Sequence, residues 1–431
     1  MKQAPEAPSK PVRFDSFAPF RNRDFALFWS GAFVSNIGTW METVAFGVYV
    51  TNLTGKAVWP GLVAAATFVP TAFLGPVGGA LADRMPRKAI LLGTTAVQML
   101  FAGLITTLMV TGSPAPIVVA MVAFGSGCAA AIGFPAYQAM IPDLVPLEDL
   151  PGAIALGSAQ WNLGRIIGPL LAGVAIKLGG GSVEWALGAN TVSFFAVVVV
   201  LLLITLPRPA ADARSVKIIA AIRSGFRLVR ADPGLRIVIQ TMSLNTLLAA
   251  PFIALIPAMA IKVLGANKDG SAVSVLVTAQ GIGAVAAALA IGPLGARRGM
   301  RWIMVRSVGL VPFALILYAI APNLPLSAIA IVFVGALYLA SLSCFTTIAQ
   351  QRAPAEFRGR VLSVNNVILG TLYPIGAALQ GFLADHFGLR TVTAGSAIVM
   401  LGALVAVRTL RPGYTNALDT PLAPAVVELG P

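Results

Sequence analysis

Twelve long apolar stretches follow one another along the chain, and they decide what it can fold into. Each has about 20 residues or more, the length that a helix needs to cross a bilayer. Hydrophobic residues make up 57% of the 431 residues and charged residues only 11%, whereas a soluble domain carries about 25% charged residues. The sequence therefore predicts an all-α integral membrane protein with twelve transmembrane helices. The stretches lie at 25–52, 57–82, 88–111, 115–140, 152–178, 183–206, 235–262, 271–295, 302–321, 325–350, 361–384 and 390–409.

The basic residues predict how the chain is oriented in the membrane. The formal net charge is +14, from 30 Lys and Arg against 16 Asp and Glu. Most of the Lys and Arg lie on one side, in the N-terminal tail, in every second connection between spans, and after the last span. By the positive-inside rule this side is cytoplasmic, with both termini on it. We expect a multi-pass protein of a bacterial-type cytoplasmic (inner) membrane, and no nucleic-acid partner, because topology accounts for the charge.

The longest polar interruption, residues 207–234, divides the spans six and six. The predicted organisation is a cytoplasmic N-terminal tail at 1–24, a six-helix bundle at 25–206, a cytoplasmic linker at 207–234, a second six-helix bundle at 235–410 and a cytoplasmic tail at 411–431. From Val216 to Val229 the linker alternates apolar and basic residues at helical spacing. This pattern is typical of a helix on an anionic leaflet, and a solvated linker is the alternative.

The two halves resemble each other. The segment GALADRMPRK (Gly79 to Lys88) shares Gly, Leu and Arg in register with GPLGARRGMR (Gly292 to Arg301). The segments Val145 to Gly152 and Ala353 to Arg360 share Pro and Glu in the same way. A diverged internal repeat is typical of a two-bundle transporter whose binding site lies between the halves.

From about residue 20 to 410 these residues resemble the major facilitator superfamily. The segment GALADRMPRK is similar to its signature between the second and third helices, and GRIIGPLLAG resembles the signature of drug/proton antiporters, with Ala172 in place of one Gly. The segments NRDFALFWSG, NLGRIIGP and residues 134–156 are similar to the subgroup of enterobactin exporters and macrolide efflux proteins. The resemblance implies two pseudo-symmetric bundles that rock about a midplane cavity and export a small amphipathic compound, a drug or a siderophore, in exchange for protons.

Two charged residues inside spans are the predicted proton-coupling groups, since such charges are costly and commonly functional. Glu42 lies in the first span and Arg165 at the centre of the fifth. The superfamily places these helices side by side, so we expect an alternating Glu42–Arg165 pair that a proton or the substrate breaks. A permanent buried pair is the alternative. Many drug antiporters carry an Arg in the fourth helix, but residues 117–131 hold no charge here, and Arg165 is the nearest substitute.

Three further groups of residues are predicted to serve transport. The cytoplasmic gate comprises Gly79, Asp83, Arg84, Arg87 and Lys88, and the resemblance implies that Asp83 locks an outward-facing state by contacting the start of the eleventh helix. Ala296 stands at the matching position of the second copy, so this latch is expected on one side only. The antiporter-like helix contributes Gly164, Gly168, Pro169 and Gly173. Candidates for the substrate cavity, or alternatively for hydrogen bonds between helices, are Trp40, Tyr49, Tyr137, Gln138, Asn162, Asn190, Gln240, Asn245, Gln280, Asn365, Asn366 and Tyr373.

The sequence lacks the motifs of other energy sources and chemistries. There is no phosphate-binding loop for ATP, and the single histidine, His386, with Cys128 and Cys344 far apart, supplies neither a catalytic triad nor a metal cluster. We therefore expect no enzyme activity and no cofactor or metal, with the proton gradient as energy source. The expected partners are a small-molecule substrate and the lipid bilayer, and the expected functional unit is a monomer. An importer, a lipid or lysophospholipid flippase and a non-transporting sensor remain as alternatives.

Overall fold

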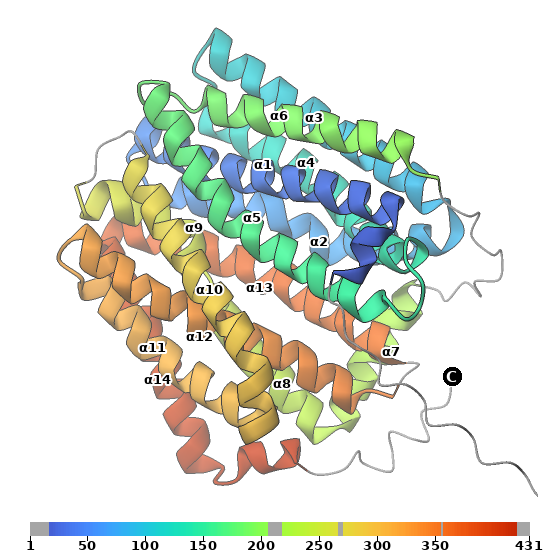
Figure 1. Cartoon of the computed structure of the whole chain (residues 1–431). Helices are drawn as coiled ribbons and strands as arrows, with labels where there is room; N and C mark the ends of the chain where they lie inside the picture. The colour runs from blue at the N-terminus through green and yellow to red at the C-terminus, as the bar shows by residue number, and fades with distance from the viewer. Residues whose placement is uncertain (1–16, 206–217, 266–269, 355–356, 420–431) are drawn as a thin grey trace, which may run out of the picture.

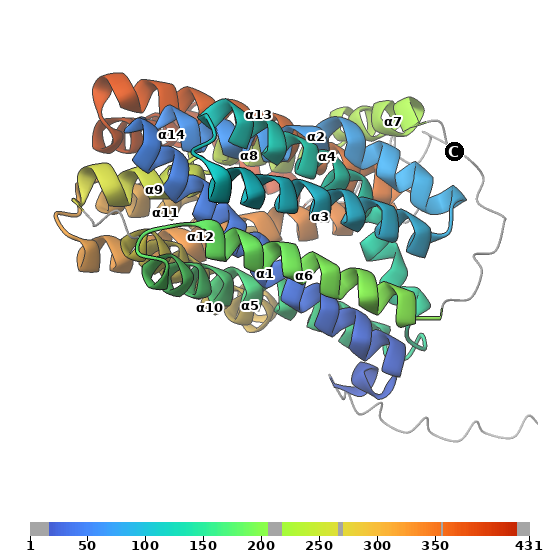
Figure 2. The same cartoon turned by 90° about the horizontal axis from the view of Figure 1, so that it is seen from above.

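The computed structural model describes residues 17–205, 218–265, 270–354 and 357–419, and within these ranges the chain is helical with no strand. Figure 1 shows two groups of helices stacked on each other, and Figure 2 shows them from above. The N-terminal helices are α1 (Arg23–Thr54), α2 (Val58–Arg84), α3 (Arg87–Thr111), α4 (Pro116–Met140), α5 (Leu150–Leu178) and α6 (Glu184–Leu203). The C-terminal helices are α8 (Pro233–Leu248), α9 (Phe252–Ala258), α10 (Ser271–Arg298), α11 (Met300–Ile320), α12 (Leu324–Arg352), α13 (Arg358–Phe387) and α14 (Leu389–Leu410).

Ten stretches of helix in the described part of the chain are long and apolar enough to cross a membrane. Helices α1 and α5 are as long, at 32 and 29 residues, but they are more polar and are not among the ten. These two helices carry Glu42 and Arg165, respectively, and they pack against each other. The expected count of twelve spans stays a prediction for α1 and α5.

The seventh predicted span, 235–262, is not one continuous α-helix. Helix α8 ends at Leu248, a turn at Ala249–Pro251 follows, and α9 passes into a π-helical turn at Met259–Val263. Proline cannot donate the hydrogen bond that a helix interior requires, so Pro251 and Pro257 interrupt the regular pattern. The carbonyl of Asn245 accepts hydrogen bonds from the amides of both Ala249 and Ala250 at the break.

The N-terminal and C-terminal helices meet mainly where α2 packs on α13 and α5 packs on α10, and α1 and α2 make smaller contacts with α9. Glycines make this approach close enough for backbone to touch backbone. A Cβ atom added to Gly61 of α2 would lie 2.4 Å from the carbonyl oxygen of Ala377, and one added to Gly370 of α13 would lie 2.6 Å from the amide nitrogen of Ala72. A Cβ on Gly173 of α5 would lie 2.5 Å from the hydroxyl oxygen of Ser274 on α10.

These close contacts are confined to the middle and one end of the molecule. We call the end that holds the start of α1 and the end of α2 the basic face, and the end that holds the start of α2 and the end of α13 the opposite face. Toward the basic face, a Cβ on Gly79 of α2 or on Gly292 of α10 would meet nothing within 4 Å. The last turns of α10, including Leu289, are exposed. The two halves are therefore joined at the opposite face and separate toward the basic face.

An aspartate closes the opposite face. The carboxylate of Asp385, at the end of α13, accepts hydrogen bonds from the backbone amides of Ala57 (2.7 Å) and Val58 (3.0 Å), where α2 begins. Lys262 forms an ion pair with the same carboxylate at 3.1 Å. An anion at a helix N-terminus is stabilised by the unpaired amides and by the helix dipole. Asp385 thus joins the two halves across the opposite face, whereas Asp83 on the basic face is exposed and forms no hydrogen bond or ion pair with a described residue.

The base of the C-terminal helices is held by a buried ion pair. Arg352, at the end of α12, donates from Nε (2.9 Å) and Nη2 (2.8 Å) to Asp232, which caps the start of α8. Arg352 also donates to the carbonyl of Leu418, in a short 3₁₀ turn at Tyr414–Leu418 that docks on α8. The described part of the C-terminal tail is therefore tied to the bundle.

The linker prediction falls partly outside the described residues, because residues 206–217 are not described. Helix α7 (Ile218–Ala231) covers most of the amphipathic stretch and packs on α13 and α8. Leu228 and Val229 are buried in this contact, and Arg223, Arg227 and Arg230 are exposed. The apolar side of the linker helix therefore packs on protein, and its arginines face outward.

The close approach of α1 to α5 predicts that Gly168 tolerates no larger residue. A Cβ atom there would lie 2.5 Å from the Cβ of Trp40 and 2.7 Å from the carbonyl oxygen of Ile37. We expect Gly168→Ala to lower the free energy of unfolding by about 1–3 kcal/mol, as overpacking does. The matched control, Gly402→Ala, lies in the interior of α14 with no atom within 4 Å of the added Cβ, and it is expected to raise stability by up to about 1 kcal/mol. Thermal unfolding of the purified variants checks the pair, and equal stabilities would contradict the packing described.

The contact at Asp385 predicts that replacing this aspartate opens the opposite face, whereas replacing Asp83 does not. Asp385→Asn removes the charge that the α2 amides and Lys262 bind, so the opposite face should open more often. Spin labels on Lys56→Cys and Thr391→Cys, with both native cysteines replaced by Ser, report this opening as a longer inter-label distance. Asp83→Asn is the control of equal charge change, and it should not lengthen the distance. No lengthening in Asp385→Asn, or equal lengthening in both variants, would contradict the assignment.

Candidate functional site

Polar and aromatic side chains from both halves gather around Arg165, in the middle of α5. Its Nε donates to the side-chain oxygen of Gln280 on α10 (3.1 Å). Its guanidinium lies over the ring of Trp40 on α1, 5.4 Å from the ring centroid. Gly281 lets α10 reach α5 at this level, since a Cβ there would lie 3.1 Å from the carbonyl oxygen of Arg165. The α5–α10 contact thus places a charge where the two halves meet.

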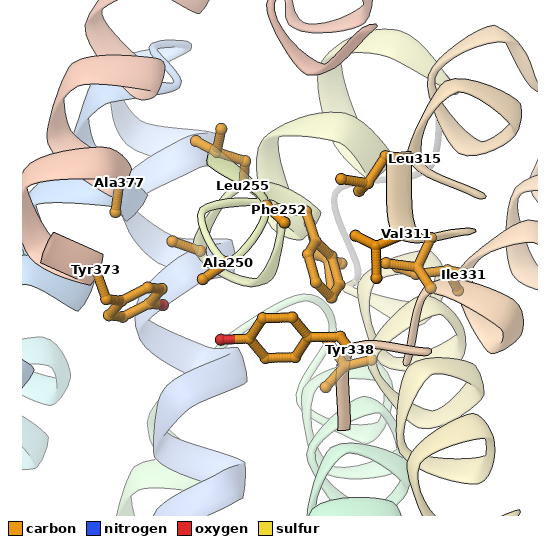
Figure 3. Close-up of a cluster of buried hydrophobic side chains, with 14 of the residues drawn as sticks. Ala250, Phe252, Leu255, Val311, Leu315, Ile331, Tyr338, Tyr373 and Ala377 are labelled. Atoms are coloured by element: carbon orange, nitrogen blue, oxygen red, sulfur yellow. The ribbon is translucent and has the colours of Figure 1, made fainter. Parts of the chain in front are cut away.

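Two tyrosines of the C-terminal half complete this group, which we call the central cluster: Trp40, Arg165, Gln280, Tyr338 and Tyr373. Tyr338 of α12 and Tyr373 of α13 both interact electrostatically with Arg165, and the two tyrosines also interact with each other. Figure 3 shows their hydroxyl groups directed toward one another from the two helices. Phe252 packs edge-on against Tyr338, and Phe68 of α2 packs edge-on against Tyr373.

No carboxylate balances the charge of Arg165 in the described part of the chain. The ion pairs found there are Arg87–Asp143, Lys262–Asp385, Arg301–Asp419 and Arg352–Asp232. The electrostatic neighbours of Arg165 are the two tyrosines, which are neutral acids. The Arg165 residue is nevertheless only 7% exposed, and an unbalanced buried charge is costly.

The expected pair of Glu42 with Arg165 is not formed in this structure. Asn190 of α6 donates its amide to the Glu42 carboxylate at 2.5 Å, and Ser193 in turn donates to the Asn190 side-chain oxygen at 3.1 Å. Glu42 therefore lies between α1 and α6, on a different side of α1 from Trp40. The first and fifth helices are neighbours, as expected, but Glu42 and Arg165 point to different partners.

Two buried amides of the C-terminal helices are unpaired. Asn245 of α8 and Asn365 of α13 are 0% and 3% exposed, and both side-chain atoms of each have no hydrogen-bond partner among the described residues. The side-chain Nε2 of Gln280 is unpaired as well. Because buried polar groups are usually hydrogen-bonded, these amides are available to a polar ligand or to water.

Other predicted cavity residues bond within the protein. Tyr137 donates to Gln160 on α5 (2.8 Å) and stacks on Phe28. Tyr49 donates to the carbonyl of Pro114, at the opposite face (2.9 Å), and Asn162 donates to the carbonyl of Ser158 in its own helix (2.9 Å). Gln138 is exposed on α4. The structure does not bring these four into the central cluster.

The predicted cytoplasmic gate residues divide into bound and unbound groups. Arg87 donates to Asp143 (2.5 Å) and to the carbonyl of Ala139 (2.7 Å), and Lys88 donates to the carbonyl of Ile204 at the end of α6 (2.7 Å). Asp83 and Arg84 are exposed, and Gly79 has open space beside it. The contact of Asp83 with the start of the eleventh span is not made in this structure, in which the halves are separated at the basic face.

The antiporter-like residues of α5 serve two neighbours. Gly164 and Gly168 face α1, where added Cβ atoms would meet Asn36 and Trp40 at 2.5 Å. Gly173 faces Ser274 of α10. Pro169 lies inside α5 next to Gly168 and is buried. This stripe of small residues sets the position of Arg165, because it holds α5 against α1 of its own half and against α10 of the other half.

Tyr338 was not among the residues predicted from the sequence. A tyrosine in the middle of an otherwise apolar span is a signal that could have found it, because its hydroxyl needs a partner in the membrane. Among the described residues no group of three or more His, Cys, Asp and Glu side chains is placed to hold a metal ion.

Comparison with known proteins places the chain in a family. The family model described as transmembrane secretion effector, of the major facilitator superfamily, matches residues 14–424. Macrolide efflux protein A of Streptococcus pyogenes is 24% identical over 85% of this chain and 90% of its own length. The multidrug efflux pump Tap of Mycolicibacterium fortuitum is 26% identical (86% and 91%), and the enterobactin exporter EntS of Salmonella choleraesuis is 29% identical (84% and 82%).

Solved structures share the fold. A bacterial homologue of the human lysosomal transporter Spinster, in an inward-facing and occupied conformation, superposes with a TM-score of 0.74 at 15% identity, covering 94% of this chain and 99% of that one. The nucleoside transporter NupG superposes with a TM-score of 0.70 at 14% identity (89% and 98%). The expected fold class is thereby confirmed. The chain belongs to the transmembrane secretion effector family of the major facilitator superfamily, and it is a membrane transporter and not an enzyme.

Proposed function

We propose that the protein is a proton-coupled exporter of a small amphipathic compound, a drug or a siderophore, that works by alternating access. The central cluster is the observation that carries the proposal, because it joins side chains of α1 and α5 to side chains of α10, α12 and α13 in the middle of the molecule. A compound bound there contacts both halves, so its affinity depends on how the halves are arranged. Such a difference in affinity is what couples binding to a conformational change.

The relatives support export as the direction of transport. Their names state macrolide efflux, multidrug efflux and enterobactin export. The cargoes named are thus drugs and a siderophore. In the proposal the basic face is cytoplasmic and both termini lie there, because Lys and Arg are enriched on cytoplasmic connections. The conformation described, joined at the opposite face and separated at the basic face, is then inward-facing and ready to load cargo from the cytoplasm of a bacterial-type inner membrane.

The proton gradient is the proposed energy source, without a cofactor, and the monomer is the proposed unit. Glu42 is the proposed proton carrier, with Asn190 as its partner in this conformation. The amide can donate to a carboxylate and also accept from a carboxylic acid, so the contact can hold both protonation states. Arg165 belongs to the cargo site in this proposal, because Gln280 and Trp40 are its neighbours.

Replacing Glu42 separates proton coupling from cargo movement. Glu42→Gln keeps the shape of the side chain but cannot carry a proton, so compound-dependent proton flux in proteoliposomes should fall to that of empty vesicles. Exchange of labelled for unlabelled erythromycin or enterobactin, whichever the wild type moves, needs no net proton transfer and should stay within about twofold. Glu148→Gln, at an exposed loop position, is the control of equal charge change.

Three outcomes would count against the proposal. Full proton flux in Glu42→Gln removes the carrier assignment. Accumulation of compounds on the cytoplasmic side under the same gradient indicates an importer. Movement of lysophospholipid without any drug or siderophore indicates a flippase.

A further inference from the structure

The charge of Arg165 has no counter-charge in the protein as described. Among the described residues, its guanidinium hydrogen-bonds to the neutral amide oxygen of Gln280, and it stacks on the neutral ring of Trp40. Its Nη atoms form no hydrogen bond with a described residue and are not fully buried. They are therefore free donors at the accessible edge of the guanidinium. That edge belongs to the 7% of the residue that is accessible.

Other arginines of the chain show how the protein treats this side chain elsewhere. Arg352 is similarly buried and is matched by the carboxylate of Asp232 through two hydrogen bonds. Arg306 also lies over a tryptophan ring, Trp302, at 5.5 Å, but it is exposed. Arg165 is buried like the first and unmatched like the second. A charge in the membrane interior normally pairs or marks a pathway, and the fold supplies no acid for it here.

The neighbours of Arg165 add donors and ring faces, and no negative charge. The Tyr338 and Tyr373 hydroxyls can each donate one hydrogen bond, and Gln280 Nε2 is a free donor. A ligand that accepts from several donors and carries negative charge satisfies all of them, and arginine binds a carboxylate or a phosphate through two parallel bonds. The Trp40, Tyr338 and Tyr373 rings offer apolar contact beside the charge.

We infer that the cargo of this transporter carries an anionic group, which binds Arg165 in the central cluster, next to an aromatic or apolar body that packs on Trp40, Tyr338 and Tyr373. The inference rests on the proposed function and specifies its cargo as an amphipathic anion. Binding supplies the missing counter-charge from the cargo itself. An empty site therefore leaves the guanidinium unbalanced, and a filled site stabilises the contact between α5 and the C-terminal helices.

Matched pairs of small aromatic probes test the inference. Benzoate, salicylate and 1-naphthoate are each compared with the corresponding amide, which has nearly the same shape and no charge. Binding to the purified full-length chain in detergent is measured by calorimetry. Wild type should bind at least one acid about 10- to 100-fold more tightly than its amide, the range that a charge-assisted hydrogen bond supplies.

Variants assign the preference to Arg165. Arg165→Gln should bind acid and amide alike, and Arg165→Lys, which keeps the charge but loses the fork of donors, should retain part of the preference. Arg306→Gln removes an arginine that also stacks on tryptophan, and it should behave as wild type. Elution position and tryptophan emission identify any variant that fails to fold, in which case Arg165→Lys and Gln280→Leu carry the test, the latter by weakening acid binding.

The outcomes separate this inference from the proposed function. If no acid binds more tightly than its amide, or if Arg165→Gln keeps the preference, the inference is overturned. If erythromycin, a cation, is exported under a proton gradient with the same dependence on Arg165, the exporter stands and the anionic cargo does not. If acids bind through Arg165 but no compound moves against a gradient, the anion site stands and the exporter does not.

Discussion

The close contact of α5 with α10 joins the two halves in the middle of the molecule and fixes the position of Arg165 between them. Gly173 and Gly281 let these helices touch across the two halves, and Gly281 meets α5 at the backbone of Arg165 itself. The Arg165 side chain binds Gln280 at the same level. On its other side, α5 is held to α1 through Gly164 and Gly168. A charge that the membrane would otherwise exclude is thus fixed in the middle of the protein, within reach of tyrosines from two further helices.

Helices α2 and α13 join the two halves at the opposite face, and the family resemblance implies that the same pair meets in the reverse direction at the basic face. At the opposite face, Asp385 at the end of α13 binds the amides at the start of α2. The family resemblance implies the reverse arrangement at the basic face, with Asp83 at the end of α2 on the start of α13. The two contacts cannot both be tight if the halves rock as rigid bodies, and here only the contact of Asp385 is formed. Alternation between them provides a physical basis for two stable states.

The sequence predicted the order of the spans but not how each helix is rotated about its axis. Length and hydropathy are enough to place a span, because lipid requires about 20 apolar residues whatever their arrangement. Trp40 and Glu42 are only two residues apart, yet in the structure they face α5 and α6 respectively, so knowing that α1 lies beside α5 did not reveal which of them meets Arg165. The break at Ala249–Pro251 was likewise hidden in a stretch that is mostly apolar, although Pro251 and Pro257 marked its place.

Alternating access requires the opposite face to open during transport, and a reversible cross-link shows whether it does. Val58→Cys in α2 and Asp385→Cys in α13 join the halves at the point where the Asp385 carboxylate accepts a hydrogen bond from the amide of Val58 at 3.0 Å, in a chain whose native cysteines are replaced by Ser. Export of a compound that the unlinked variant moves should stop when the disulfide forms and return when it is reduced, while binding from the basic face persists. Undiminished export by the oxidised protein would contradict alternating access between these halves.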